Sequence, residues 1–443
     1  MEDRVFEKKL LELALAHGCE AAETYSAKSD SFEATVLDGE LDRYAVSTQG
    51  GLSLRVQVNG KNGYAYTENA DDPIALVERA MDNARAIEIA DEHPMQGHCE
   101  YQNVAAKQGA LSKLSEQEKI NLAKRMEKAA LAADPRVKRV SYCEVGSAVG
   151  SIGIYNTLGL SAERTNGMDY CYVQPILEQD GEVRTGLAFR CGADAADVEG
   201  CAREAVAEAA EKFGAKPVAS GGYRVIIRNT AMADLTEAFL DMFSADEAQK
   251  GCSLLADREG EKIADEKISI FDDPFHPVAP RAFDDEGTPC YKKALVENGV
   301  LKTLMHNLKT AKKAGVVSTG NGVRPSAASS VSVGASVLYI APGSKDLAAL
   351  TQEMRDGLII TELDGLHAGL DPISGDFSLK AAGQRVENGN VTGPVAQITL
   401  AGNFLAMLQN VIAVGSDLKF TLPSGTYSAS PSILFGELNV AGK

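Results

Sequence analysis

Repeated Asn-Gly and Asp-Gly pairs constrain the fold of this 443-residue chain more than any other feature. Such a pair supplies both positive φ angles of a tight hairpin turn, because Asn and Asp tolerate a left-handed backbone and Gly has no Cβ. Around Asn59-Gly60 the flanking residues alternate between apolar and polar, as at Leu52, Leu54 and Val56. The chain is therefore predicted to be rich in antiparallel hairpins. The pairs read as turns are Asp38-Gly39, Asn59-Gly60, Asp180-Gly181, Asn298-Gly299 and Asn388-Gly389.

Helical patterns alternate with these strands. A first helix is predicted before Gly18, and a second begins at Pro73 with Ile74, Val77, Met81 and Ala84 as its buried stripe. The capping box Ser115-x-x-Glu118 opens a third helix. Strands are expected over 137–148, 151–156, 168–178 and 182–190, followed by a helix over about 195–213.

These elements predict an α+β protein of two domains. Residues 1–218 are expected to form an N-terminal α/β domain whose helices pack on a mixed or antiparallel sheet. Residues 219–443 are expected to form a β-rich, barrel-like or sandwich domain that contains one helix over 231–246. The stretch 213–222, with its Gly and Pro residues, is the predicted boundary.

Composition narrows the class of protein. The formal net charge is −18, which argues against nucleic acid as a direct partner, because phosphate binding needs a basic face. No run of about 18 apolar residues predicts a membrane span, and the polar N-terminus lacks a signal-peptide pattern. The eight cysteines include no CxxC pair, which is typical of reduced thiols. We therefore expect a soluble, cytoplasmic protein without membrane contact.

A search for chemistry gives only weak signals. No two histidines are four residues apart, so no helix presents two imidazoles to one zinc ion. His93, His98 and Cys99 could form a metal site, although a polar loop is favoured there. The acidic run 283–287 is read as a solvated loop or a cation site. The Gly-rich segment 318–322 is read as a turn or as a set of backbone donors for a ligand.

Several segments, taken in order, resemble the TldD/PmbA family of metallopeptidases, which are also described as modulators of DNA gyrase. The resemblance spans nearly the whole chain, and it is the order and spacing of the motifs together that make it specific. The segments are Gly50-Gly51-Leu52-Ser53-Leu54-Arg55-Val56, Gly63-Tyr64-Ala65-Tyr66-Thr67, Asp284-Asp285-Glu286-Gly287-Thr288-Pro289, Val296-Glu297-Asn298-Gly299, Ser318-Thr319-Gly320-Asn321, Ser374-Gly375-Asp376-Phe377-Ser378, Val386-Glu387-Asn388-Gly389 and Ala401-Gly402-Asn403-Phe404.

The family resemblance implies two branches. The TldD branch binds zinc through an HExxxH helix and a distant cysteine, whereas the TldE or PmbA branch lacks that motif. Here the corresponding residues read Thr236-Glu237-Ala238-Phe239-Leu240-Asp241, and the cysteine position falls near Ala381. Zinc catalysis needs three protein ligands and an open position. The resemblance thus implies the TldE branch, with no metal in this chain, Glu237 as a vestigial catalytic position, and Thr236 and Asp241 in place of histidines.

We expect this chain to be the non-catalytic subunit of a heteromeric protease. The zinc of that protease would lie in a TldD-type partner. The substrates of the protease would be extended or unfolded peptides, such as microcin precursors or antitoxins, and the chain could form a homodimer when alone. A peptide or partner cleft is predicted from Glu237, Gly320, Asn321, His367 and Asp376. One alternative is an active peptidase with a non-standard metal held by Glu237, Asp241 and His367. Another is a stand-alone regulatory protein linked to DNA gyrase.

Overall fold

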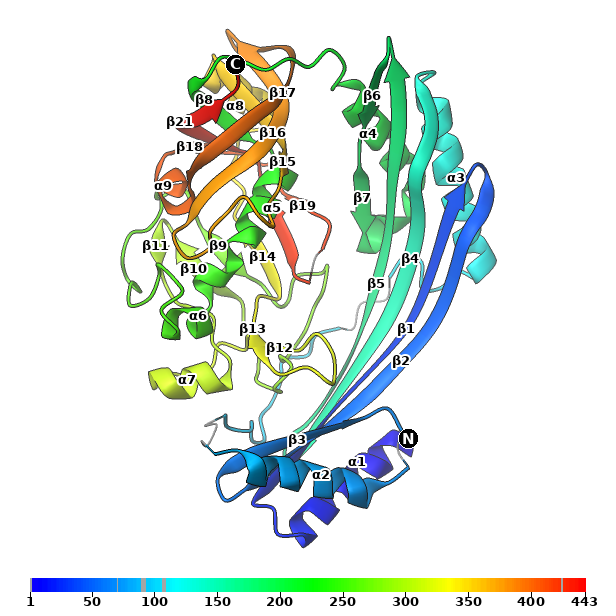
Figure 1. The fold of residues 1–443 in the computed structure, drawn as a ribbon, viewed down its shortest axis with the longest axis vertical. Coiled ribbons are helices and arrows are strands. Elements are labelled where there is room, and N and C mark those ends of the chain that lie inside the picture. Colours follow the sequence, from blue (N-terminus) through cyan, green and yellow to red (C-terminus); the bar gives the residue numbers. More distant parts are fainter. Residues whose placement is uncertain (1, 70, 89–92, 106–108, 424) are drawn as a thin grey trace.

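The computed structural model describes residues 2–69, 71–88, 93–105, 109–423 and 425–443. It is an α+β protein in which a long sheet stands beside a β-rich body (Figure 1). The strands of the long sheet come from residues 21–191, and the strands of the β-rich body come from 221 onward. Among the described residues, no helix combines the length and apolarity needed to cross a bilayer.

The long sheet is antiparallel, and its strands are ordered β3-β2-β1-β4-β5-β6, with β7 also paired to β5. The tight turns fall where Asn-Gly and Asp-Gly pairs predict them, with φ of 52° at Asn59 and 71° at Gly60. The expected break between 148 and 151 is absent, because Gly150 pairs with Ser29 and Asn166 and the ladder continues. The strands are β1 (Ala21–Leu37), β2 (Glu40–Val58), β3 (Lys61–Thr67), β4 (Val137–Asn156), β5 (Ser161–Gln179), β6 (Glu182–Thr185) and β7 (Ala188–Cys191).

In the described parts of the chain, helices cover one face of this sheet, which we call the outer face. α1 (Glu2–Ala16) and α2 (Pro73–Ala86) pack at one end, and α3 (Glu116–Ala133) and α4 (Val198–Ala210) pack at the other (Figure 1). The capping box at Ser115 is confirmed. Ile74 is 49% exposed, so its predicted place in the α2 stripe is wrong; Leu76 and Ala80 are buried there instead.

The opposite face of the sheet, the inner face, is turned toward the β-rich body. Because side chains alternate along a strand, Tyr25 of β1 and Arg164 of β5 project from this face. The Arg324 guanidinium lies over the Tyr25 ring, 4.6 Å from its centroid. Arg164 forms an ion pair with Asp285. These contacts attach the β-rich body to the half of the sheet that carries α1 and α2, and ion pairs of Glu204 with Lys419 and of Lys212 with Glu362 attach it at the α4 end.

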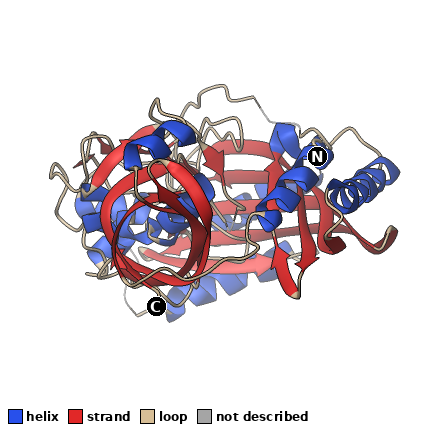
Figure 2. Cartoon of the chain, turned by 90° about the horizontal axis from the view of Figure 1, so that it is seen from above, coloured by secondary structure: helices blue, strands red, loops and turns tan. Residues whose placement is uncertain are grey.

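The β-rich body contains a closed barrel, which appears as a ring of strands in Figure 2. Its strands run β17-β16-β15-β8-β21, and the pairing of β17 with β21 closes the ring. The tight turn at Asn388-Gly389 joins β16 to β17 as predicted. The strands are β8 (Gly221–Ile227), β15 (Gly357–Asp364), β16 (Asp376–Glu387), β17 (Asn390–Asn403) and β21 (Ile433–Ala441), with β18 (Val411–Val414) paired to β21.

A second sheet and short helices pack beside the barrel. The sheet order is β11-β10-β9-β14-β20-β19, and β12 pairs separately with β13. The large core cluster includes Phe239, Phe404 and Phe435. The strands are β9 (Ile270–Asp272), β10 (Lys293–Glu297), β11 (Val300–Leu301), β12 (Gly322–Val323), β13 (Ser332–Val333), β14 (Val337–Ile340), β19 (Lys419–Phe420) and β20 (Tyr427–Ser430). The helices are α5 (Asn229–Ala238), η2 (Leu240–Phe243), α6 (Ala245–Gln249), α7 (Leu308–Ala314), α8 (Leu347–Met354) and α9 (Phe404–Gln409).

Two predicted helices differ from the observed ones. The helix expected over 195–213 is a 3₁₀ turn, η1 (Gly192–Ala196), followed by α4. The helix expected over 231–246 is divided into α5, η2 and α6. Phe239 leaves the α-helical conformation, with φ −101° and ψ 12°. Ser244 then caps α6 by accepting a hydrogen bond from Glu247 N–H.

Candidate functional site

Segment 236–241, where the resemblance locates the metal helix, straddles the end of α5. Thr236 is buried, and its Oγ1 donates to the Met232 carbonyl at 2.7 Å, so its hydroxyl serves the helix itself. Asp241 lies beyond the break, exposed in η2. The break at Phe239 separates Thr236 from Asp241, so one continuous helix does not hold the two side chains.

The side chain of Phe239, in the middle of this segment, is fully buried. Its ring stacks on Phe404 with centroids 4.6 Å apart and meets the edge of Phe377 at 6.4 Å. Phe377 and Phe404 each belong to a C-terminal motif of the family resemblance. Those motifs therefore pack on Phe239 at the point where α5 ends.

A zinc ion does not fit these residues. The Thr236 hydroxyl is committed to Met232, Asp241 is displaced by the helix break, and Ala381 offers a buried methyl group where a cysteine would be required. Within the described part of the chain, no group of three His, Cys, Asp or Glu side chains is arranged to hold a metal ion.

Two carboxylates remain on α5, one turn apart. Asp234 is partly buried and accepts a hydrogen bond from Thr421 Oγ1 beside β19. Burial raises the pKa of Asp234, the Thr421 hydrogen bond opposes the rise and the negative charge of Glu237 adds to it, so that the pKa is about 6. Glu237 is half-buried.

Asp376 lies close to the same segment. Asn403 Nδ2 donates to Asp376 Oδ1 at 2.9 Å and to the Ser374 carbonyl at 2.8 Å. A Cβ built on Gly375, whose φ is +79°, would lie 3.4 Å from Met242 Cε of η2. Asp376 is exposed, and His367 is exposed in the loop between β15 and β16.

Gly320 and Asn321 belong to a different network. Asn321 is fully buried, and its Nδ2 donates to Asp272 Oδ2 at 2.7 Å and to the Gly334 carbonyl at 2.9 Å. Lys293 Nζ completes the network 2.9 Å from Asp272. Gly320 has φ +71°, and an added Cβ would lie 2.8 Å from the Pro289 carbonyl oxygen. The structure thus places these two residues in a packed polar interior around β9, rather than beside Phe239.

The acidic run 283–288 joins the long sheet to the β-rich body, and we call it the clamp. Arg164 Nη2 lies 2.6 Å from Asp285 Oδ1, and Tyr101 donates to the Gly287 carbonyl at 2.7 Å. His93 pairs with Glu286. The carboxylates of this run are buried, so the expectation of a solvated loop is wrong. Burial, and then the charge of Glu286, raises the pKa of Asp284 to about 7.

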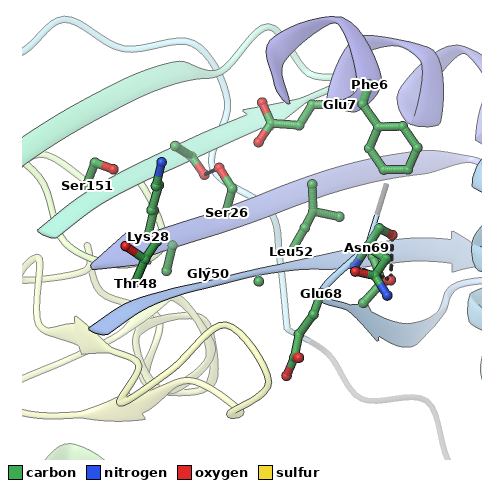
Figure 3. A pocket seen from close by; sticks show the side chains of 14 residues that line it. Phe6, Glu7, Ser26, Lys28, Thr48, Gly50, Leu52, Glu68, Asn69 and Ser151 are labelled. Atoms are coloured by element: carbon green, nitrogen blue, oxygen red, sulfur yellow. Dashed lines mark hydrogen bonds between the residues drawn. The ribbon is translucent and has the colours of Figure 1, made fainter. Parts of the chain in front are cut away.

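A shallow depression lies on the outer face, away from α5 (Figure 3). Its volume is about 290 Å³, and it opens between α1 and the exposed middle of β1 and β2. Phe6 and Leu52 form its apolar side, and Lys28 and Ser151 lie at the other end (Figure 3). No residue of the predicted cleft lines it.

Comparisons with known proteins match the whole length of the chain. Profiles described as PmbA/TldA metallopeptidase domain 1, central domain and C-terminal domain match residues 22–84, 109–213 and 220–442. The metalloprotease PmbA of Escherichia coli O157:H7 is 27% identical over 469 aligned positions, covering 99% of this chain and 97% of the relative.

Solved structures show the same fold. A Thermotoga maritima MSB8 protein named as a candidate modulator of DNA gyrase is 35% identical, with a TM-score of 0.91 and coverage of 99% of this chain and 100% of that one. TldE from Thermococcus kodakarensis is 25% identical, with the same TM-score and the same coverage.

Proposed function

Because the chain belongs to the PmbA/TldA metallopeptidase family, we propose that it is the non-catalytic, TldE-like subunit of a heteromeric metalloprotease. The observation that carries the proposal is Phe239, whose buried ring ends α5 inside the segment where the metal helix would stand. The surrounding family motifs are kept, and they pack on that ring. A scaffold retained around a site that cannot hold zinc favours a role beside a zinc-bearing partner in the cytoplasm.

In this proposal the partner supplies the zinc-bound water, and this chain supplies structure and substrate contacts. Extended or unfolded peptides are the substrates, because a flat sheet face and short sheet edges accept an extended backbone. The clamp fixes the long sheet relative to the barrel through buried ion pairs and hydrogen bonds. That rigidity would keep substrate contacts in register with the catalytic subunit.

A candidate contact for the partner lies after α7. Residues 312–317 are all exposed, and Val317 is 87% exposed, whereas Ser318 is buried immediately after it. Ser318 Oγ donates to the His306 carbonyl at 3.0 Å, so the exposed Val316 and Val317 directly precede an anchored residue. Adjacent exposed apolar side chains on a fixed support favour a surface that another subunit covers.

The test combines this chain with a TldD-type chain that carries an intact HExxxH. We expect a stable heteromer by light scattering, with zinc bound in the partner and peptidase activity higher than that of the partner alone. Val317→Ser should weaken the heteromer without lowering thermal stability, and Ile74→Ser, an exposed apolar residue on α2, is the matched control. No complex and no change in partner activity would refute the proposal.

A second candidate is a hydrolase that uses the α5 carboxylates directly. The observation that favours it is the pKa of Asp234, raised to about 6 with Glu237 one turn away. Such a pair could hold a non-standard metal or act as an acid and a base. Peptidase activity of this chain alone, together with a stoichiometric metal, both lost in Glu237→Ala, would establish this candidate in place of the first.

A further inference from the structure

The inner face of the long sheet continues past the clamp and carries a cluster of aromatic and acidic side chains. We call Glu33, Tyr142, Glu144, Tyr170 and Tyr172 the tyrosine–glutamate patch. They project from one face of β1, β4 and β5, because Glu144 pairs with Tyr172 and the others follow at alternate positions. Tyr142 is 58% exposed, and the other members are half-buried.

Hydrogen bonds and ring stacking fix the patch. Tyr170 donates to Glu144 Oε1 at 2.8 Å, and Tyr172 donates to Glu144 Oε2 at 3.2 Å. The two rings are stacked, with centroids 6.3 Å apart and planes 14° apart. Burial and then Glu144 raise the pKa of Tyr172 to about 12, so the phenol stays a neutral donor at physiological pH. The patch therefore presents flat rings beside the negative charges of Glu33 and Glu144.

The patch lies on the same sheet as the clamp contacts, and its strand β5 neighbours β7, which approaches the α5 region. It lies six residues along β5 from Arg164 of the clamp, which is about 20 Å in an extended strand. Tyr170 pairs with Cys191 of β7. Burial, and then the nearby Cys191 thiol, raises the pKa of Tyr427 of β20, so β7 and β20 are neighbours. α5 packs directly against β20. The β7 edge of the sheet, next to Tyr170, thus lies beside β20, against which α5 packs.

We propose that the tyrosine–glutamate patch binds extended peptide segments that carry lysine or arginine. A cationic side chain can lie over a tyrosine ring and pair with a carboxylate at the same time. The sheet face gives an extended backbone room to lie across several strands, and the net charge of −18 attracts cationic peptides over longer distances. The inference rests on the proposed function in one respect, namely that such peptides would be substrates of the heteromer.

The test measures peptide binding to the full chain by fluorescence anisotropy. The probes are unstructured, labelled twelve-residue peptides of equal length that carry lysines, glutamates or only neutral polar residues. We expect the lysine peptide to bind about tenfold more tightly than the neutral one, and added salt to reduce the difference. Glu144→Gln removes the charge but keeps an oxygen for the tyrosines, and Tyr142→Ala removes an exposed ring. Each should weaken binding of the lysine peptide about five- to tenfold.

Tyr44→Ala is the matched control, because Tyr44 is a half-exposed tyrosine hydrogen-bonded to Glu116 on the outer face. It should leave lysine-peptide binding unchanged. Equal binding of lysine and neutral peptides by the wild type would overturn the inference. So would losses in Tyr142→Ala and Glu144→Gln no larger than in Tyr44→Ala.

The heteromer separates this inference from the proposed function. In the active complex, Glu144→Gln should raise KM for lysine-rich peptides about five- to tenfold and leave kcat unchanged, because the charge acts in binding alone. If the chain binds lysine peptides through the patch but forms no complex with a TldD-type partner, the proposed function fails and the binding site stands. If the complex is active but shows no preference for lysine peptides, the binding site fails alone.

Discussion

The β-rich body contains two acidic segments whose similar side chains have different surroundings. One is 234–241, on α5 and η2, and the other is the clamp at 283–288. The clamp carboxylates are buried and each is matched by a donor, as Asp285 is by Arg164 and by Arg324 N–H at 2.7 Å. Asp234 and Glu237 are only partly buried, and Asp241 is exposed. The clamp is built for stability, whereas segment 234–241 keeps ionisable groups at a surface that a partner or peptide could reach.

The difference shows why acidic composition alone does not identify a site. A buried carboxylate with fixed donors contributes mostly through the penalty of losing a partner. A partly exposed carboxylate with a raised pKa retains freedom to gain or lose a proton. Substitutions in the two segments should therefore differ in size and in pH dependence.

The largest effect is expected at the clamp. Arg164→Ala removes the ion-pair partner of Asp285, whose side chain is 6% exposed, and should lower the free energy of unfolding by about 3 kcal/mol. Urea unfolding followed by circular dichroism measures the loss. Arg4→Ala is the control, because Arg4 pairs with the neighbouring Glu163 at 3.8 Å in an exposed position, and it should change stability by less than about 0.5 kcal/mol. Equal losses in the two variants would contradict a structural role for the clamp.

A smaller effect is expected from rebuilding the histidine pair. Thr236→His combined with Asp241→His puts a larger ring in a buried position and should destabilise the chain by about 1–3 kcal/mol. It should bind no stoichiometric zinc, because position 236 is buried in α5 whereas position 241 lies exposed beyond the break at Phe239. Elemental analysis after dialysis against zinc measures this, with Asp241→His alone as the control. One zinc ion per chain in the double variant would show that the two positions can converge on a metal ion.

Titration of Asp234 should make the free energy of unfolding depend on pH by about 1–2 kcal/mol, allowing for its partial exposure. Its pKa in the folded chain, about 6, lies above the ordinary value of 3.8. The folded state thus binds the proton more tightly than the unfolded state, and stability falls as the pH rises from about 4 to 6. In Asp234→Asn this fall should disappear. Urea midpoints measured across the window test it.

Thr421→Val sharpens the result at Asp234. The Thr421 hydrogen bond lowers the pKa of Asp234, so its removal should move the pH-dependent loss of stability to higher pH. Glu237→Gln should move it to lower pH, because the neighbouring negative charge is removed. A midpoint profile that is the same in both variants would show that Asp234 does not titrate in this range.

The sequence predicted local structure well where a turn has a unique chemical requirement. Asn59-Gly60 and Asn388-Gly389 each adopt two positive φ angles, and each joins paired strands. The capping box at Ser115 begins α3 for the same kind of local reason. The helix break at Phe239 depends on tertiary packing against Phe404, which no local pattern shows. The Ser244-x-x-Glu247 spacing was the one signal of a new helix start there.

The candidate site was less accessible to sequence reasoning. The family resemblance located segment 236–241 and the motif around Asp376, which the structure brings together through Phe239 and Met242. The resemblance could not show that Asn321 lies away from this segment, because its burial against Asp272 depends on the tertiary structure. The tyrosine–glutamate patch was missed because its members come from three strands that are distant in sequence. Alternation along β4 and β5 at Tyr142, Glu144, Tyr170 and Tyr172 was the available signal.

The smallest effect is expected at Asp241, and it tests the comparison most directly. Burial and then Glu247 raise the pKa of Asp241, so its charged form is slightly disfavoured in the folded chain. Asp241→Asn should therefore change the free energy of unfolding at pH 7 by less than about 0.5 kcal/mol, toward greater stability. Thermal unfolding at pH 7 measures it, with Asp285→Asn as the contrasting clamp variant. A loss at Asp241 as large as that at Asp285 would mean that segment 234–241 is held as firmly as the clamp and is not a surface left open for a partner.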